Sequence, residues 1–279
     1  MIEVKDVNQS YYKQVASQTL SNINLVVKEK AITALVGANG AGKSTLLSVM
    51  TNILPAISGE VRLDGVNIRK IKARELSKKI AFLRQSQQLS INITVNDLVE
   101  YGRFPHCGGR LMKEDHEKVN EALTYMNLLE LRHRYLEELS GGQRQRAFIA
   151  MILAQDTPYI FLDEPLNNLD IKYSVEMMKI IKKLVDELDK TIVVVLHDIN
   201  FAAAYADHIV AMKDGKIHRE GKPNEIITNE VLNPVFDHHF NISMQNGKCV
   251  CLYFDENECS AVKKRKGCER AIKKLKNVQ

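Results

Sequence analysis

The stretch GANGAGKST, residues 37–45, decides how the rest of this sequence is interpreted. It fits the pattern G-x-x-x-x-G-K-[ST] and stands between an apolar run, residues 32–37, and a helical pattern, residues 44–53. A glycine-rich turn between a strand and a helix exposes backbone N–H groups, and the start of the helix adds its positive dipole. This context favours a phosphate-binding loop over a glycine-rich turn without a function.

Each part of this loop has its own task in binding phosphate. Gly37, Gly40 and Gly42 let the backbone turn tightly and bring N–H groups close to phosphate oxygens. Lys43 supplies a mobile positive charge for the β- and γ-phosphates, and the hydroxyl of Ser44 is a ligand for Mg²⁺. The loop by itself predicts a nucleoside triphosphate and a magnesium ion, and nothing more specific.

Two acidic residues end a second apolar strand, YIFLDEP at residues 159–165. Ligands of open α/β sheets bind beyond the carboxyl ends of the strands, so we expect Asp163 and Glu164 to face the phosphate site. Asp163 can hold the magnesium shell. Glu164 can orient or deprotonate the attacking water, because adjacent residues on a strand point in opposite directions and can serve two tasks.

A second candidate anion site is LSGGQ, residues 139–143. Ser140 is a good N-cap residue, and the glycines after it leave the first N–H groups of a helix uncovered, so this helix start is suited to an anion. The phosphate loop already provides one such site. These residues alone leave open what the second site would hold.

Short apolar strands alternate with helical patterns along most of the chain, which predicts an α/β fold with a mostly parallel sheet covered on both faces. The pattern is helical from about Thr94 to Asp156, which indicates an inserted subdomain. Residues 208–221 predict a hairpin with its turn at Asp214-Gly215.

Length and composition fit one large domain that carries such an insertion, since the chain has 279 residues of which 45% are hydrophobic. The N-terminal MIEVKDV lacks the pattern of a signal peptide and the longest apolar runs are too short to cross a bilayer, so we expect a soluble, cytoplasmic protein. The cysteines form no C-x-x-C pair, which favours reduced thiols over a disulfide framework or a zinc site. They are Cys107, Cys249, Cys251, Cys259 and Cys268.

The positive net charge of +5 is concentrated at the C-terminus. Residues 262–279 hold eight Lys or Arg and one Glu, so the remainder of the chain is slightly acidic, unlike a domain that binds nucleic acid through its fold. We interpret this tail as a solvated basic helix. Contact with anionic lipid or with an acidic partner is the alternative interpretation.

With these residues in place, about residues 1–254 resemble an ATP-binding-cassette (ABC) ATPase. The motifs follow the order of that family: the phosphate loop at 37–45, a glutamine loop at LRQSQQ (83–88), the signature LSGGQ at 139–143, the acidic strand at 159–164, NNLD at 167–170, and His197. The resemblance implies a P-loop NTPase core with an antiparallel β subdomain and an inserted helical subdomain. The expected boundaries are 1–255 for the ABC domain, about 1–85 and 157–255 for its core, about 86–156 for the helical subdomain and 256–279 for the basic tail.

The resemblance also implies what the second anion site holds. In this family two cassettes pack head to tail, and the signature of one faces the γ-phosphate of ATP on the phosphate loop of the other. Ser140, Gly142 and Gln143 would therefore contact a nucleotide on a partner subunit, and Asp170 would link the two sites across the dimer.

Further roles come from the same resemblance. Gln85 would ligate Mg²⁺ and sense the γ-phosphate, His197 would hydrogen-bond the γ-phosphate and help hold water, and an aromatic residue would stack on adenine, either Tyr11 or the competing Tyr12. The implied catalytic residues are Glu164, His197, Lys43 and Gln85, and the implied metal ligands are Ser44, Gln85 and Asp163. The implied nucleotide contacts are Tyr11, Gly37, Ala38, Asn39, Gly40, Ala41, Gly42, Lys43, Ser44, Thr45, Ser140, Gly141, Gly142, Gln143 and Asp170.

Two positions depart from the family pattern. Ala38 stands where relatives often have Pro, and Asn168 stands where Ser or Ala is common. The second difference leaves open the detail of the Asp170 contact, whereas the expected ATPase activity is unaffected.

A single cassette with a short helical subdomain and no fused membrane span resembles the ATPase subunit of a bacterial importer. The segments TVNDLVEYGRFPH (94–106) and 147–171 resemble those of iron–siderophore importers. The resemblance implies ATP and Mg²⁺ as cofactors. It also implies a homodimer, or a dimer with a similar ATPase, docked on integral-membrane permease subunits at the cytoplasmic face of the cell membrane. An external substrate-binding protein is implied indirectly, and no nucleic acid is expected. The alternatives are import of haem or vitamin B12, or a non-transport ABC ATPase that acts on nucleic acid or the ribosome through its basic tail.

Overall fold

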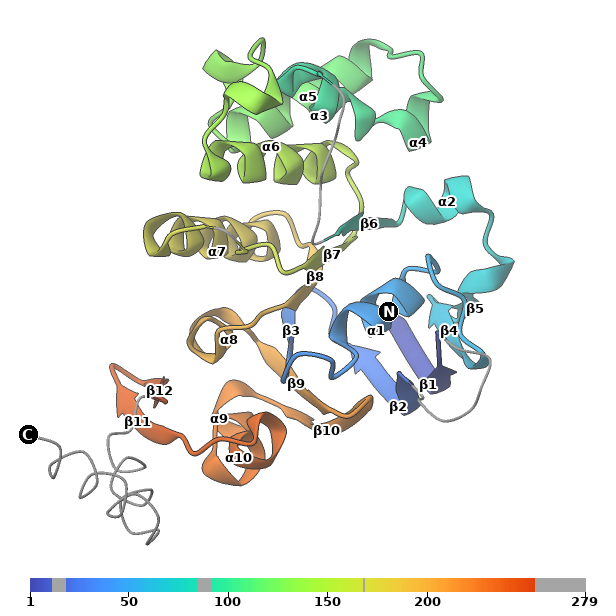
Figure 1. The fold of residues 1–279 in the computed structure, drawn as a ribbon. Coiled ribbons are helices and arrows are strands. Elements are labelled where there is room, and N and C mark those ends of the chain that lie inside the picture. The colour runs from blue at the N-terminus through green and yellow to red at the C-terminus, as the bar shows by residue number, and fades with distance from the viewer. Residues whose placement is uncertain (12–18, 85–91, 168, 254–279) are drawn as a thin grey trace, which may run out of the picture.

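The computed structural model describes residues 1–11, 19–84, 92–167 and 169–253, and a six-stranded sheet runs through its centre (Figure 1). The strand order is β10-β9-β3-β8-β7-β6, in which β9, β3, β8, β7 and β6 are parallel and β10 is antiparallel at the edge. The strands are β3 (Ile32–Val36), β6 (Ile80–Leu83), β7 (Tyr159–Asp163), β8 (Thr191–Val195), β9 (His208–Lys213) and β10 (Lys216–Gly221). The expectation of a mostly parallel sheet is confirmed.

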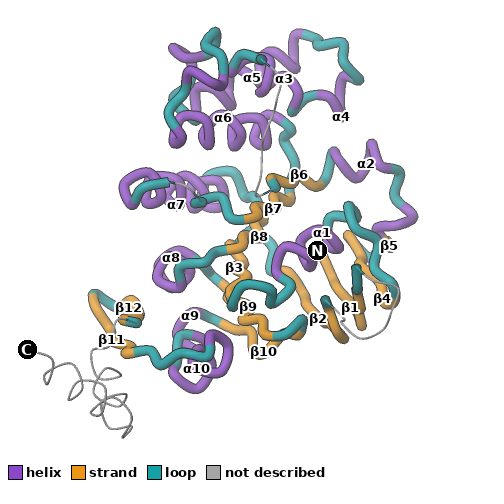
Figure 2. Tube along the Cα trace, viewed as in Figure 1, coloured by secondary structure: helices purple, strands orange, loops and turns teal. Residues whose placement is uncertain are grey.

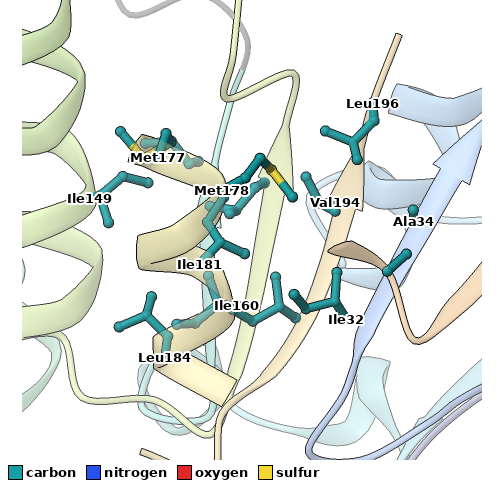
Figure 3. Packing of buried hydrophobic residues seen from close by; sticks show 14 of the residues in the cluster. Ile32, Ala34, Ile149, Ile160, Met177, Met178, Ile181, Leu184, Val194 and Leu196 are labelled. Atoms are coloured by element: carbon teal, nitrogen blue, oxygen red, sulfur yellow. The ribbon is translucent and has the colours of Figure 1, made fainter. Parts of the chain in front are cut away.

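Both faces of the parallel strands of this sheet are buried, which explains why these strands read as apolar runs, whereas the edge strand β10 is polar and mostly exposed. Successive residues of β7 point to opposite faces, so Phe161 belongs to one apolar cluster while Ile160 and Leu162 belong to the other. Figure 3 shows Ile160 and Val194 of the sheet against Met178 and its neighbours on α7. The sheet therefore separates two hydrophobic cores, one on each of its faces.

One face of the sheet is covered by α1 (Lys43–Met50) and, beyond it, by an antiparallel sheet of order β2-β1-β4-β5 (Figures 1 and 2). Its strands are β1 (Ile2–Gln9), β2 (Leu20–Val27), β4 (Ser58–Leu63) and β5 (Val66–Asn67). The other face is covered by α7 (Ile171–Asp186) and α8 (Ile199–Tyr205). The antiparallel subdomain predicted from the sequence is thus present.

The middle of the chain forms a separate group of helices at the top of Figure 1. These are α3 (Val95–Tyr101), α4 (Phe104–Cys107), α5 (Lys113–Tyr125) and α6 (Gly141–Ala154), with short 3₁₀ turns at Leu129–Leu131 and Leu136–Glu138. Helix α6 lies beside α7, and Ile149 of α6 points toward Met177 of α7 (Figure 3). The inserted helical subdomain therefore meets the core along these two helices.

The described chain ends in α9 (Pro223–Ile226), α10 (Asn229–Phe236) and a two-stranded sheet of β11 (Asn241–Gln245) and β12 (Lys248–Leu252). Asn200 at the start of α8 fastens this small sheet. Its side-chain amide donates to the carbonyl of Cys251 at 3.1 Å, and its Oδ1 accepts the Cys251 N–H at 2.8 Å. Cys107, Cys249 and Cys251 are free thiols, as expected of these three positions.

Several elements differ from the sequence pattern. The helix expected over 44–53 ends at Met50 because Asn52 takes a positive φ of 60°. β4 ends at Leu63, before a turn at Asp64 and Gly65, although the alternating pattern of its sequence continues to residue 65. β1 was not predicted, because Asp6 has φ 48° and a register shift between Val4 and Val7 interrupts its alternation. β2, α2 (Ala73–Ser77), α8 and β11 were also not predicted.

None of the helices among the described residues combines the length and the apolar character needed to cross a membrane.

Candidate nucleotide-binding site

The phosphate loop, residues 37–42, leaves β3 at the centre of the sheet and leads directly into α1. Its first residue, Gly37, has φ 149°, and a Cβ at that position would lie 2.2 Å from the carbonyl oxygen of Met212 on β9. No other residue fits this close approach without a shift of the backbone. The first glycine of the motif is thus required by packing against β9, as well as by the shape of the loop.

The turn between β9 and β10 supports the loop from outside. Gly215 donates its N–H to the carbonyl of Ala41 at 3.2 Å, and its own carbonyl accepts the N–H of Ser21, at the start of β2, at 2.8 Å. Gly215 also packs closely on Thr19, where an added Cβ would lie 2.5 Å from the carbonyl oxygen. The turn therefore ties the phosphate loop to the antiparallel sheet.

The Lys43 side chain lies inside the loop. Its ammonium donates to the carbonyl oxygens of Gly37 at 2.8 Å and Ala38 at 3.0 Å, and the residue is only 5% exposed. Burial lowers the pKa of Lys43, and the nearby carboxylates of Glu164 and Asp163 partly oppose that shift. Lys43 is held by weak neutral acceptors close to the position of a phosphate, so an anion would compete well for it.

Ser44 and Asp163 meet across the gap between α1 and the end of β7. The hydroxyl of Ser44 donates to Oδ1 of Asp163 at 2.8 Å, and Asp163 is 6% exposed. Burial raises the pKa of Asp163, while the Ser44 hydrogen bond lowers it and the neighbouring Glu164 raises it further. A hydroxyl and a carboxylate at this spacing are oxygen donors of the kind that Mg²⁺ takes beside substrate phosphates, so these residues fit such an ion.

Glu164 and His197 end neighbouring strands and contact each other. Nε2 of His197 lies 2.6 Å from Oε1 of Glu164, and the glutamate side chain is 8% exposed against 44% for the histidine. Asn167 donates from Nδ2 to Oε2 of Glu164 at 3.1 Å. The backbone of Glu164 has φ 52°, a left-handed conformation that costs a non-glycine residue energy and turns its side chain sharply away from the strand.

These acidic and basic groups border a pocket of about 160 Å³. Glu164, Asn167 and His197 contribute polar groups to it, and Leu166 and Phe201 contribute apolar surface. The predicted residues Glu164 and His197 are thus brought together, as the sequence order alone could not show.

Tyr11 lies against the first turn of α1. Its hydroxyl is 3.1 Å from Oγ1 of Thr45, and the residue is 61% exposed, so the ring has an open face beside the loop. The competing Tyr12 and the predicted magnesium ligand Gln85 lie outside the described residues.

The signature begins α6 in the helical subdomain. Ser140 is its N-cap, and its hydroxyl accepts the N–H of Gln143 at 3.3 Å while the Gln143 side chain accepts the N–H of Ser140 at 3.0 Å. This reciprocal capping box leaves Ser140 and Gly141 exposed to solvent and Gly142 buried. The structure confirms the predicted helix start, with Ser140 at the exposed end of α6.

Asp170 is the N-cap residue of α7. Its Oδ1 accepts the N–H of Tyr173 at 2.9 Å, and the adjacent Ile171 is 82% exposed. Asp170 therefore stands at an exposed helix start.

The Gly-Arg-Phe-Pro segment, residues 102–105, has mainly a packing role. Arg103 is 4% exposed, and it donates from Nε to Asp115 at 2.9 Å and from Nη1 to the carbonyl of Ala154 at 2.9 Å. An added Cβ on Gly102 would lie 2.1 Å from the carbonyl of Met151. The arginine and glycine thus join α3, α5 and the end of α6, whereas Phe104 remains 58% exposed.

Two residues near the site were missed by the sequence reasoning. Asn167 belongs to the NNLD motif, but the sequence did not indicate that its side chain contacts Glu164. Tyr173, which contacts Gly142, is separated from the signature by an entire strand and loop. Neither contact is visible without the fold.

Comparisons with known proteins agree with this geometry. A family model described as "ABC transporter" matches residues 20–167. The petrobactin import ATP-binding protein YclP of Bacillus subtilis is 49% identical over 254 residues, which cover 91% of this chain and all of YclP. The iron(3+)-hydroxamate import ATP-binding protein FhuC of the same organism is 38% identical, over 85% of this chain and 89% of FhuC.

Solved structures share the fold as well as the sequence. A dimeric post-hydrolysis state of the ATP-binding cassette MJ0796, bound to ADP and Pi, is 34% identical and superposes with a TM-score of 0.71. The match covers 80% of this chain and 99% of that one.

Proposed function

This chain belongs to the ABC transporter family and is an ATPase of that family, and from this premise we propose that it powers the import of an iron(III)–siderophore. The observation that carries the proposal is the match at 49% identity to the whole of a petrobactin import ATP-binding protein. The similarity to an iron(3+)-hydroxamate import protein supports the same substrate class.

The nucleotide lies on the phosphate loop, with its phosphates along residues 37–45 and its adenine against Tyr11. Lys43 leaves the carbonyls of Gly37 and Ala38 and bonds the β- and γ-phosphates, because an anionic acceptor forms much the stronger hydrogen bond. Ser44, Asp163 and Gln85 would hold Mg²⁺, which would supply positive charge beside the phosphate oxygens.

Glu164 positions the attacking water and accepts its proton. The carboxylate is presented to the pocket by the left-handed turn after β7 and is held at one oxygen by His197 and at the other by Asn167. His197 turns to the γ-phosphate once nucleotide is bound. Because the developing charge spreads over the γ-phosphoryl oxygens, this chemistry depends on positioning and electrostatics.

A second copy of the chain completes each site. Ser140, Gly142 and Gln143 of one subunit bind the nucleotide of the other, and Asp170 links the two sites. The exposure of Ser140 supports this arrangement, as does the dimeric state of a similar cassette with ADP and Pi.

The helical subdomain receives the permease at the cytoplasmic face of the membrane. A pocket of about 340 Å³ between α3, α4 and the loop after them is lined by Tyr101, Phe104 and Leu111, and the first two are 59% and 58% exposed. Exposed aromatic residues beside a pocket are typical of a protein-binding surface. We retain the division into a core of about 1–85 and 157–255, a helical subdomain of about 86–156 and a tail of 256–279.

Uptake by cells tests the substrate class. A strain that lacks this chain should fail to take up radiolabelled ferric siderophore and recover with the wild-type chain but not with Lys43→Ala. Normal ferric-siderophore uptake in the deleted strain, with lost uptake of haem or vitamin B12, would overturn the assignment.

Purified protein tests the chemistry. Glu164→Gln should bind ATP and form an ATP-dependent dimer, with turnover reduced by roughly 10²- to 10⁴-fold. Near-normal turnover would exclude Glu164 as the key carboxylate.

A further inference from the structure

The ring of Tyr173, in the first turn of α7, lies directly on the second glycine of the signature. A Cβ added to Gly142 would be 3.0 Å from both Cγ and Cδ1 of Tyr173, closer than most real contacts of that kind. Gly142 is buried and Tyr173 is half-buried, so the contact is an enclosed one. The α-carbon of Gly142 therefore rests on the face of the ring, with no side chain between them.

The ring is fixed on its own side by the cap of α7. The N–H of Tyr173 donates to Oδ1 of Asp170 at 2.9 Å, and the ammonium of Lys172 lies 5.7 Å from the ring centroid. A capped first turn holds its backbone in one conformation, and the backbone determines where the ring stands. The position of the Tyr173 ring therefore depends on the position of Asp170.

The same contact fixes the start of α6. Ser140 and Gln143 form a capping box around Gly142, so the residues that present N–H groups and a hydroxyl to solvent move with that glycine. Further along, α6 and α7 are packed through Ile149 and Met177 (Figure 3). The contact between Gly142 and Tyr173 lies at the end of this α6–α7 packing that is nearest to the signature and to Asp170.

We propose that Tyr173 is a positioning residue whose ring couples Asp170 to the signature within one subunit, so that both surfaces offered to the partner move as one unit. The proposal rests on the proposed function, because it assumes that a second copy of the chain binds against these surfaces. The thickness of the ring determines how far the capped start of α6 stands from the capped start of α7. A smaller side chain would let the two motifs vary independently and would weaken dimer formation.

ATP-dependent dimerisation in the Glu164→Gln background tests this directly, measured by sedimentation against the ATP affinity of the single subunit. Tyr173→Ala should weaken dimerisation by about tenfold and leave ATP affinity of the single subunit unchanged. Tyr173→Phe, which keeps the ring, should restore dimerisation. Tyr173→Leu is smaller than tyrosine but has more packing area than alanine, so its loss of dimerisation should be intermediate.

The matched control is Tyr125→Ala. Tyr125 also joins the helical subdomain to α7, because its hydroxyl donates to Glu187 at 3.1 Å, but it does so at the opposite end of that helix. We expect this variant to lose thermal stability and to dimerise normally. An equal loss of dimerisation in Tyr125→Ala and Tyr173→Ala would overturn the proposal, because the effect would then be one of general stability.

A double-mutant cycle gives the sharpest result. Gly142→Ala pushes against the ring when Tyr173 is present, and it has free space when residue 173 is Ala. The dimerisation penalty of Gly142→Ala should therefore be several-fold smaller in the Tyr173→Ala background. An equal penalty in both backgrounds would overturn the proposal, since Gly142 would then be required only for the nucleotide. Failure of the parent Glu164→Gln to dimerise with ATP would instead overturn the proposed dimer itself.

Discussion

Asn167 and Glu164 are linked twice, once by the side-chain amide of Asn167 on the carboxylate at 3.1 Å and once by its backbone N–H on the carbonyl of Glu164 at 3.2 Å. This places Glu164 in a tight turn immediately after β7. His197, at the end of the neighbouring strand, takes the other carboxylate oxygen at 2.6 Å. The carboxylate is therefore oriented by residues on both sides.

The first prediction concerns Asn167. Removal of its amide in Asn167→Ala should lower kcat by roughly tenfold with little change in the KM for ATP, because a hydrogen bond to a charged group is worth about 1.5–3 kcal/mol. Asn167→Asp has nearly the same shape but sets a like charge against Glu164, so it should lower kcat further. Steady-state ATPase kinetics would test this. Equal kcat values for Asn167→Ala and Asn167→Asp would contradict an orienting role for the amide.

The second prediction follows from the raised pKa of Asp163. Burial keeps this carboxyl protonated in the folded state at pH values above the ordinary 3.8, where the unfolded chain has already lost the proton. The group therefore favours folding below the unfolded pKa, and this contribution is lost as pH rises through the raised pKa. Above the raised pKa, the cost of burying the charge of Asp163 is only partly offset by Ser44 and Lys43.

Asp163→Asn keeps an acceptor for Ser44 and removes the charge. Nucleotide-free Asp163→Asn should unfold at a higher temperature at neutral pH, by roughly 2–4 °C for each kcal/mol gained. The gain should shrink as the pH is lowered toward 3.8. Stabilisation by Mg-ATP should be lost. Thermal denaturation across pH measures both effects, with Asp214→Asn, at an exposed turn, as control. A gain that grew in acid would contradict this prediction.

The third prediction concerns Arg103, which is buried and therefore has a structural role rather than a role in contact with a permease. Arg103→Ala should destabilise the fold by about 3–5 kcal/mol, because it leaves Asp115 buried without its charged partner. Arg103→Met with Asp115→Leu should recover much of that loss, and the exposed Arg110→Ala should have little effect. Urea denaturation measures all three. A fully stable Arg103→Ala that fails to support uptake would assign the residue to permease contact instead.

The fourth prediction separates Tyr11 from Tyr12. Loss of the ring in Tyr11→Ala should weaken ATP binding by about tenfold, in line with ~1–3 kcal/mol for stacking of a base on an aromatic side chain. Tyr11→Phe loses only the contact with Thr45 and should bind ATP nearly as well as the wild type. Titration with a fluorescent ATP analogue is a suitable measurement. A larger effect for Tyr12→Ala than for Tyr11→Ala would reverse the assignment.

Much of the site could be predicted because its parts are local. The phosphate loop, the acidic strand end and the cap of α6 each depend on residues within one short segment, and the structure confirms where each segment lies in the fold. The spacing of Ser140 and Gln143 is itself the signal of a capping box, which the two side chains form.

The remaining features depend on contacts between distant segments. The pairing of Glu164 with His197 requires β7 and β8 to be neighbours. The sequence of neither strand predicts that order. β1 escaped recognition because the irregular backbone at Asp6 breaks the period that identifies a strand. The buried role of Arg103 was hidden for a similar reason, because its partner Asp115 lies on another helix.

The turn at Asp214-Gly215 has a practical consequence for genetics. Gly215 is bonded to the carbonyl of Ala41 on one side and to Ser21 on the other, and it has no room for a side chain beside Thr19. A random mutagenesis screen for loss of nucleotide affinity should therefore recover substitutions at this glycine. In the sequence, such substitutions would lie in a surface hairpin far from the phosphate loop. Only the three-dimensional structure shows that they affect the loop that Gly215 supports.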